Sequence, residues 1–135
     1  MHEVFESVAR YFSVLGEPTR LRILHALCQD ERCVTDIIQV TGLAQANASR
    51  HLGLMYQAGM LSRRREGTQI FYKVADPMYV ELCRTVSIQL IGRTESASTT
   101  RENLSHFAAE MQPRAQGALM NQPQPPAHQK EEASV

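Results

Sequence analysis

A tight connection at residues 41–43 (TGL) separates two short segments whose apolar residues recur at helical spacing. The first segment covers residues 34–41 and the second covers residues 45–58. Gly42 occupies the position at which a helix commonly ends on a left-handed residue, and Gly59 ends the second segment. The pattern therefore predicts two short helices joined by a tight turn, and this pair restricts the fold more than any other feature of the chain.

A change of period follows the second helix. Residues 60–65 and 69–74 read as two short strands, and residues 66–68 (EGT) between them are typical of a hairpin turn. Further helices are expected at residues 3–15, at residues 77–91, and from Pro18 to about Cys28, since proline suits the first turn of a helix. The sequence thus predicts a mainly α-helical domain with one small β-hairpin.

The composition shifts after Gly92. Residues 94–111 are rich in Ser and Thr but retain Leu104, Phe107 and Met111, so an additional amphipathic helix is expected there. Residues 112–135 contain four prolines and many Gln and Ala, which is typical of a disordered tail. We therefore divide the chain into a domain at 1–93, an additional helix within 94–111 and a tail at 112–135.

Charge and cysteine usage limit the function. The formal net charge of the 135 residues is zero, although residues 1–93 carry 11 Lys and Arg against 9 Asp and Glu, a net charge of +2. This balance argues against a wholesale polyanion binder but allows a local basic patch. Three cysteines without a dense disulfide pattern, no signal-peptide pattern and no long apolar run lead us to expect a cytoplasmic protein without a membrane partner.

The second of the two short helices is slim enough for the major groove of B-DNA, and a basic hairpin beside it can reach the phosphates. Its outward positions carry side chains that hydrogen-bond to bases and phosphates. Three consecutive arginines alternate across a strand, so one or two of them are expected to face DNA. His51 is left with two interpretations, a phosphate contact or packing beside the turn. The candidate DNA-binding residues are Gln45, Asn47, Ser49, Arg50, His51, Arg63, Arg64, Arg65 and Thr68.

These segments resemble a known family. Residues 15–24 (LGEPTRLRIL), 42–52 (GLAQANASRHL), 58–61 (AGML) and 65–72 (REGTQIFY) are similar, in order and spacing, to motifs of the ArsR/SmtB (arsenic-repressor) family. The resemblance covers about residues 5–91. It implies a winged helix-turn-helix fold and a homodimer, built mainly from the first and last helices, that represses transcription by occupying operator DNA until an inducer binds. Ala44 and Ala46 depart from the usual Ser and Pro, and the loss of Ser removes a favoured helix N-cap.

The dimer expectation also has support in the apolar pattern. The first and last helices of the domain each carry an apolar stripe, which either completes a monomer core or is covered by a partner subunit, and a symmetric dimer is favoured. The stripes consist of Phe5, Val8, Phe12, Leu82, Val86 and Leu90.

The inducer is left open. Residues 31–36 (ERCVTD) retain one thiol of the sensing motif that the resemblance implies (ELCVCD), and Thr35 is a poor ligand for soft metals. The family's zinc site on the last helix is not matched, because residues 76–78 read DPM and no His lies between positions 52 and 105. No cofactor or metal is therefore expected. Three alternatives remain for Cys28, Cys33 and Cys83: an arsenite site, a thiol oxidised by redox or reactive sulfur species, or inert buried thiols.

Two other classes of function compete with a DNA-binding repressor. A winged-helix protein-interaction module without DNA binding is the rival, since the chain as a whole is neutral. An enzyme is not expected, because no carboxylate pair, nucleophile–base set or Gly-rich phosphate loop stands out.

Overall fold

The computed structural model describes residues 1–93 and 98–113. Within these ranges it confirms the mainly α-helical fold class, and the sheet is small and antiparallel. No helix among the described residues has the length and apolar character needed to cross a membrane. In chain order, the elements are α1 (His2–Leu15), α2 (Pro18–Leu27), β1 (Arg32–Cys33), α3 (Val34–Thr41), α4 (Gln45–Gln57), β2 (Leu61–Glu66), β3 (Gln69–Val74), α5 (Pro77–Arg93) and α6 (Ser98–Glu110).

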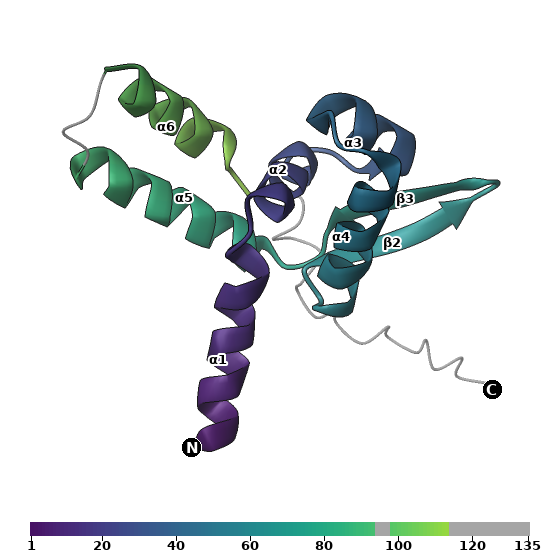
Figure 1. Cartoon of the computed structure of the whole chain (residues 1–135), viewed down its shortest axis with the longest axis horizontal. Helices are drawn as coiled ribbons and strands as arrows, with labels where there is room; N and C mark the ends of the chain where they lie inside the picture. Colours follow the sequence, from purple (N-terminus) through teal and green to yellow (C-terminus); the bar gives the residue numbers. More distant parts are fainter. Residues whose placement is uncertain (94–97, 114–135) are drawn as a thin grey trace, which may run out of the picture.

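The sheet differs from the predicted hairpin by one strand. Its order is β1-β3-β2, with Arg64 of β2 opposite Phe71 of β3 and Cys33 of β1 on the other side of the same Phe71. The sequence pattern did not predict β1, because a strand of two residues is too short to show alternation. The hairpin of β2 and β3 extends well beyond the helices (Figure 1).

Local sequence signals fix the helix ends. Glu17 is extended and its carboxylate accepts a hydrogen bond from the Arg20 backbone N–H at 3.0 Å, so Glu17 caps α2 while Pro18 opens it. Gly42 ends α3 in the left-handed region with φ 71°, where a side chain would be strained. The short turn that follows brings α4 directly against α3.

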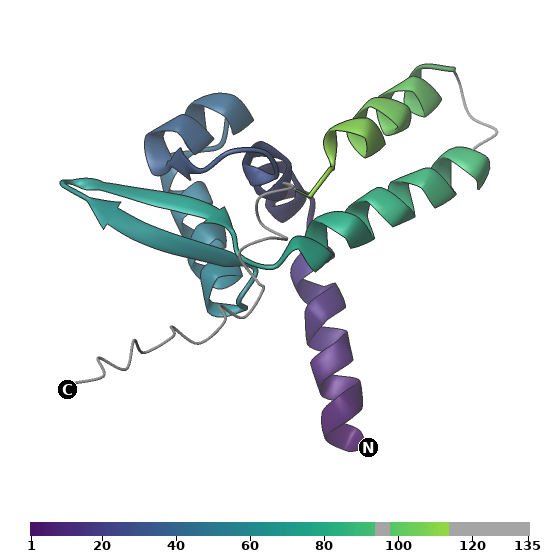
Figure 2. The ribbon, with the colours of Figure 1, turned by 180° about the vertical axis from the view of Figure 1, so that it is seen from behind.

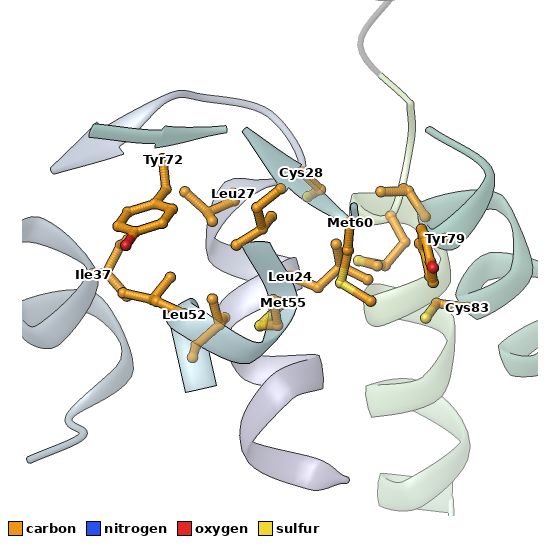
Figure 3. Packing of buried hydrophobic residues seen from close by; sticks show 14 residues of the cluster. Leu24, Leu27, Cys28, Ile37, Leu52, Met55, Met60, Tyr72, Tyr79 and Cys83 are labelled. Atoms are coloured by element: carbon orange, nitrogen blue, oxygen red, sulfur yellow. The ribbon is translucent and has the colours of Figure 1, made fainter. Parts of the chain in front are cut away.

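One apolar core joins α2, α3, α4, the sheet and the start of α5. Figure 3 shows it as a band, with Tyr72 and Ile37 towards one end and Tyr79 and Cys83 towards the other. Burial of this continuous cluster is the main stabilising term available to a chain of this size. The largest side chains with relative exposures of 0–1% are Ile23, Leu24, Ile37, Leu52, Met55, Met60, Met111 and Val80.

Helix α1 projects from the body of the molecule (Figures 1 and 2) and buries none of its residues. Its C-terminal half is attached through Tyr11, whose ring stacks on Tyr79 at 4.0 Å and whose hydroxyl donates to the Asp76 carboxylate at 2.8 Å. Burial and this carboxylate raise the pKa of Tyr11. The large apolar side chains exposed on α1 and α5 are Val4, Phe5, Val8, Phe12, Met78, Val86, Ile88 and Leu90.

Residues beyond 93 contribute to the same core. Helix α6 runs back alongside α5 (Figure 2), and Met111 just after it is completely buried. His25 of α2 contacts the Glu110 carboxylate at 2.5 Å, and the Gln29 amide donates to the carbonyl oxygens of Glu110 and Gln112. The folded unit therefore extends to Met111. Most of the tail expected at 112–135 lies outside the described residues.

Candidate nucleic-acid interface

The outer edge of α4 is exposed along its first turns. Ala48 and Leu52, both with 0% exposure, hold the inner side of the helix against the core. Gln45, Ser49 and Arg50 point away from that side and are exposed. None of the described residues covers this edge, so its polar side chains are available to a partner molecule.

Two of the candidate residues contact each other. The Arg50 guanidinium donates from Nη2 to the Asn47 side-chain oxygen at 3.3 Å. Asn47 is half-buried and lies one helical turn before Arg50. The amide therefore orients the arginine, which would otherwise sample many rotamers, and both remain at the exposed edge of α4.

His51 lies in the interior rather than at the edge. Its side chain is 6% exposed, its Nε2 is 3.9 Å from the Glu17 carboxylate, and its Nδ1 is buried without a hydrogen-bond partner among the described residues. Burial acts to raise the pKa of Glu17, but hydrogen bonds from Arg20 and Thr19 and the charge of His51 lower it overall. Of the two interpretations of His51, the geometry favours packing, here between α4 and the start of α2.

Arg63 faces α4. Its guanidinium carbon lies 4.0 Å from the centre of the Tyr56 ring, a cation–π distance. A hydrogen bond with Tyr72 is the main cause of the raised pKa of Arg63. Arg63 is therefore held on the α4 side of the hairpin, between the helix and the sheet.

Arg64 points to the opposite face of the hairpin, because successive side chains on a strand alternate. Its Nε and Nη2 donate to one oxygen of Glu31 at 2.9 and 2.6 Å, and its Nη1 donates to Glu66 at 2.5 Å. The guanidinium also lies over the Phe71 ring at 4.4 Å. These hydrogen bonds raise the pKa of Arg64, and they occupy each of its guanidinium nitrogens.

Among the described residues, the Arg65 side chain contacts neither an aromatic ring nor a carboxylate. Its Nε donates to the Gly67 carbonyl at 3.2 Å, and its side chain is exposed near the tip of the hairpin. Thr68 lies in the turn and is also exposed. The three consecutive arginines thus have three environments: an aromatic face for Arg63, two carboxylates for Arg64, and solvent for Arg65.

The three cysteines are free thiols. Cys28 and Cys83 are buried, and desolvation raises the pKa of Cys28 and raises that of Cys83 to about 11. Such thiols are mostly protonated at neutral pH and react slowly. Cys33 is half-buried. In residues 1–93 and 98–113, no group of three or more His, Cys, Asp or Glu side chains is placed to hold a metal ion.

Sequence reasoning missed the residues that hold the arginines. Tyr56 is not among the candidate residues, but it is 38% exposed and its ring supports Arg63. Glu31 is not among the candidate residues either, and it lies 33 positions away from Arg64. No local pattern links positions so far apart, so only the sheet topology brings them together.

Comparison with known proteins adds a family to this geometry. The family model described as "Bacterial regulatory protein, arsR family" matches residues 17–63, which include α2, α3 and α4. An uncharacterised HTH-type transcriptional regulator of Methanocaldococcus jannaschii is 36% identical over 85 residues, covering 62% of this chain and 96% of that protein. A probable mercury resistance operon repressor of Streptomyces lividans is 34% identical over 77 residues, which are 57% of this chain but only 62% of that relative.

Solved structures show the same arrangement. A winged helix-turn-helix DNA-binding domain from Mycobacterium bovis, described as homodimeric and as a possible ArsR-family transcriptional regulator, superposes with a TM-score of 0.58 at 30% identity, over 71% of this chain and 87% of that one. The matched family and relatives are transcription regulators, not enzymes. The chain therefore belongs to the arsR family of bacterial regulatory proteins and is a DNA-binding regulator of transcription with a winged helix-turn-helix.

Proposed function

We propose that the protein is a homodimeric repressor that occupies an operator by placing one α4 of each subunit in successive major grooves on one face of the DNA. The observation that carries this proposal is the uncovered outer edge of α4, on which Gln45, Ser49 and Arg50 are exposed while the opposite side is fixed in the core. A rod with one polar edge free is what major-groove recognition requires.

The side chains divide into base-reading and backbone-contacting groups. Arg50, oriented by Asn47, has the donors for a guanine edge, and Gln45 and Ser49 lie at the N-terminal end that enters a groove first. Arg65 and Thr68 at the hairpin tip are placed to meet phosphates, which position the protein without specifying sequence. The buried His51 side chain does not contact DNA in this proposal; it packs α4 against the start of α2.

A second copy of the chain is the proposed occupant of the apolar face on α1 and α5. Phe5, Val8 and Phe12 are 65%, 52% and 58% exposed on α1, and Val86 is 53% exposed on α5. This is a larger set of exposed apolar side chains than a small monomeric domain normally tolerates in water. The homodimeric description of the M. bovis neighbour supports the same arrangement here.

Release from the operator is assigned to an inducer of unknown identity. An inducer that reacts with thiols, such as arsenite or a reactive sulfur species, would reach Cys33 first, because burial covers Cys28 and Cys83. Operator binding by the reduced protein, repeated with arsenite, zinc and a polysulfide and then with each cysteine replaced by serine, tests this part. If one reagent abolishes operator binding and one cysteine replacement removes this effect, the reagent identifies the inducer class. No response to the three reagents excludes these inducers.

A cytoplasmic location follows from action on chromosomal DNA.

The DNA-binding part is tested by selecting duplexes from a random 30-base-pair library with the wild-type protein and measuring Kd by fluorescence anisotropy. Arg50→Ala should raise Kd for the selected duplex by about 10- to 100-fold, the range for one good base contact. The matched control is Arg101→Ala, which removes an arginine that is also exposed but lies on α6. Equal Kd values for the two variants would contradict the assigned surface, and failure to enrich any duplex would favour a protein-interaction module.

A further inference from the structure

Arg64 connects two segments of the chain that are far apart in sequence. It lies on β2, and its side chain passes over Phe71 of β3 to reach Glu31, which directly precedes β1. Because β3 is the middle strand, this contact spans the full width of the sheet. The contact with Glu66 is different, since Glu66 is only two positions away on the same strand.

The charges around Arg64 make it unsuitable for a phosphate contact. One guanidinium faces two carboxylates, so the three side chains together carry one net negative charge. The Nε, Nη1 and Nη2 groups already donate to these carboxylates. A phosphate approaching this face would meet the remaining negative charge and would have to displace charge-assisted hydrogen bonds.

The segment that Arg64 reaches is itself anchored to the body of the domain. Arg32, next to Glu31, donates from Nε to the Ala26 carbonyl near the end of α2 at 2.8 Å. By contrast, the outer part of the hairpin projects away from the helices (Figure 2), and β1 pairs with only two residues of β3. The Arg64–Glu31 link therefore restrains the hairpin from the face opposite α4, while Arg63 contacts Tyr56 on the α4 side.

We infer that Arg64 is a positioning residue for DNA binding: its bridge to Glu31 holds the β2–β3 hairpin at a fixed orientation to α4, so that Arg65 and Thr68 at the tip meet the phosphates. This inference rests on the proposed function. It divides the three arginines by role, with Arg65 as the phosphate contact and Arg64 as the residue that aims it.

The test uses a selected 30-base-pair duplex and a scrambled duplex of the same composition, with Kd measured between 50 and 200 mM salt. Arg65→Ala should weaken binding to both duplexes. It should also make the negative slope of log association constant against log salt shallower by about 0.9, which corresponds to the loss of one phosphate contact. Arg64→Ala should keep the wild-type slope and raise Kd for the selected duplex about two- to five-fold, as expected for an exposed ion pair.

Two glutamate variants form the matched comparison. Glu31→Gln and Glu66→Gln change the net charge equally and each remove one partner of Arg64, but only Glu31 ties the hairpin to another segment. Glu31→Gln should therefore raise Kd relative to Glu66→Gln, and combining it with Arg64→Ala should add nothing further. Hydroxyl-radical footprints of Arg64→Ala and Glu31→Gln should lose the outermost protected backbone positions while the central ones remain, and the footprint of Glu66→Gln should match that of the wild type.

The possible outcomes separate the two proposals. A drop in the salt slope for Arg64→Ala as large as that for Arg65→Ala would make Arg64 a phosphate contact and overturn the inference. Equal Kd values for Glu31→Gln and Glu66→Gln would overturn it as well, because the bridge would then position nothing. If instead Arg50→Ala and Arg65→Ala both bind like the wild type, the proposed DNA surface itself is wrong.

Discussion

Replacing Met111 with alanine tests whether α6 and the residue after it belong to the folded domain. The Met111 side chain has 0% exposure and lies in the cluster that contains Leu24, Cys28 and Tyr79. Met111→Ala removes Cγ, Sδ and Cε, which at about 0.8 kcal/mol per buried methylene-sized group costs about 2.4 kcal/mol. The cavity left behind adds to this loss, so we expect the free energy of unfolding to fall by about 3 kcal/mol.

The assay is urea unfolding of the full chain at one fixed protein concentration, because the stability of a dimer depends on concentration. For a domain of this size the loss corresponds to a decrease in Tm of roughly 10 °C. Gln112→Ala is the control, since its side chain is exposed and its backbone carbonyl stays available to Gln29. A change below about 1 kcal/mol for Met111→Ala would refute the conclusion that this segment completes the core.

Three further predictions follow from burial and packing. Iodoacetamide at pH 8 should alkylate Cys33 well before Cys28 and Cys83, because burial raises the pKa of both buried thiols and a thiolate is needed for the reaction; mass spectrometry showing equal rates would contradict this. Phe12→Glu should raise the dimer dissociation constant at least about tenfold by placing a charge in an apolar interface, and an unchanged sedimentation coefficient at low protein concentration would argue against that interface. Gly53→Ala should stabilise the domain by about 0.5–1 kcal/mol, because the added Cβ meets nothing within 4 Å and alanine is the better helix former; a lower Tm would contradict it.

Features with local causes could be predicted from the sequence. Pro18 and Gly42 mark helix termini because their backbone preferences do not depend on distant residues. In the structure, α2 begins at Pro18 and α3 ends with Gly42 as its C-cap. The same holds for the exposed edge of α4, since helical spacing alone separates Ala48 and Leu52 from Arg50. These local signals were enough to predict the fold class and the exposed polar edge of α4.

Features that depend on pairing over long distances could not be predicted. Strand β1 exists only because Arg32 and Cys33 pair with β3, and the three arginines differ in environment because of Tyr56, Glu31 and solvent. Identical neighbouring residues carry no signal that would distinguish such environments. Likewise, the burial of His51 depends on the approach of α2 to α4, which no local pattern contains.

The central claim is that α4 reads the major groove from both subunits of a dimer, and methylation protection tests it most directly. Dimethyl sulfate modifies guanine N7 in the major groove and adenine N3 in the minor groove, so one experiment on a selected duplex reports both grooves. We predict two clusters of protected guanine N7 positions, centred about 10 base pairs apart, that disappear with Arg50→Ala. Protection confined to adenine N3, or guanine protection that survives Arg50→Ala, would contradict the account.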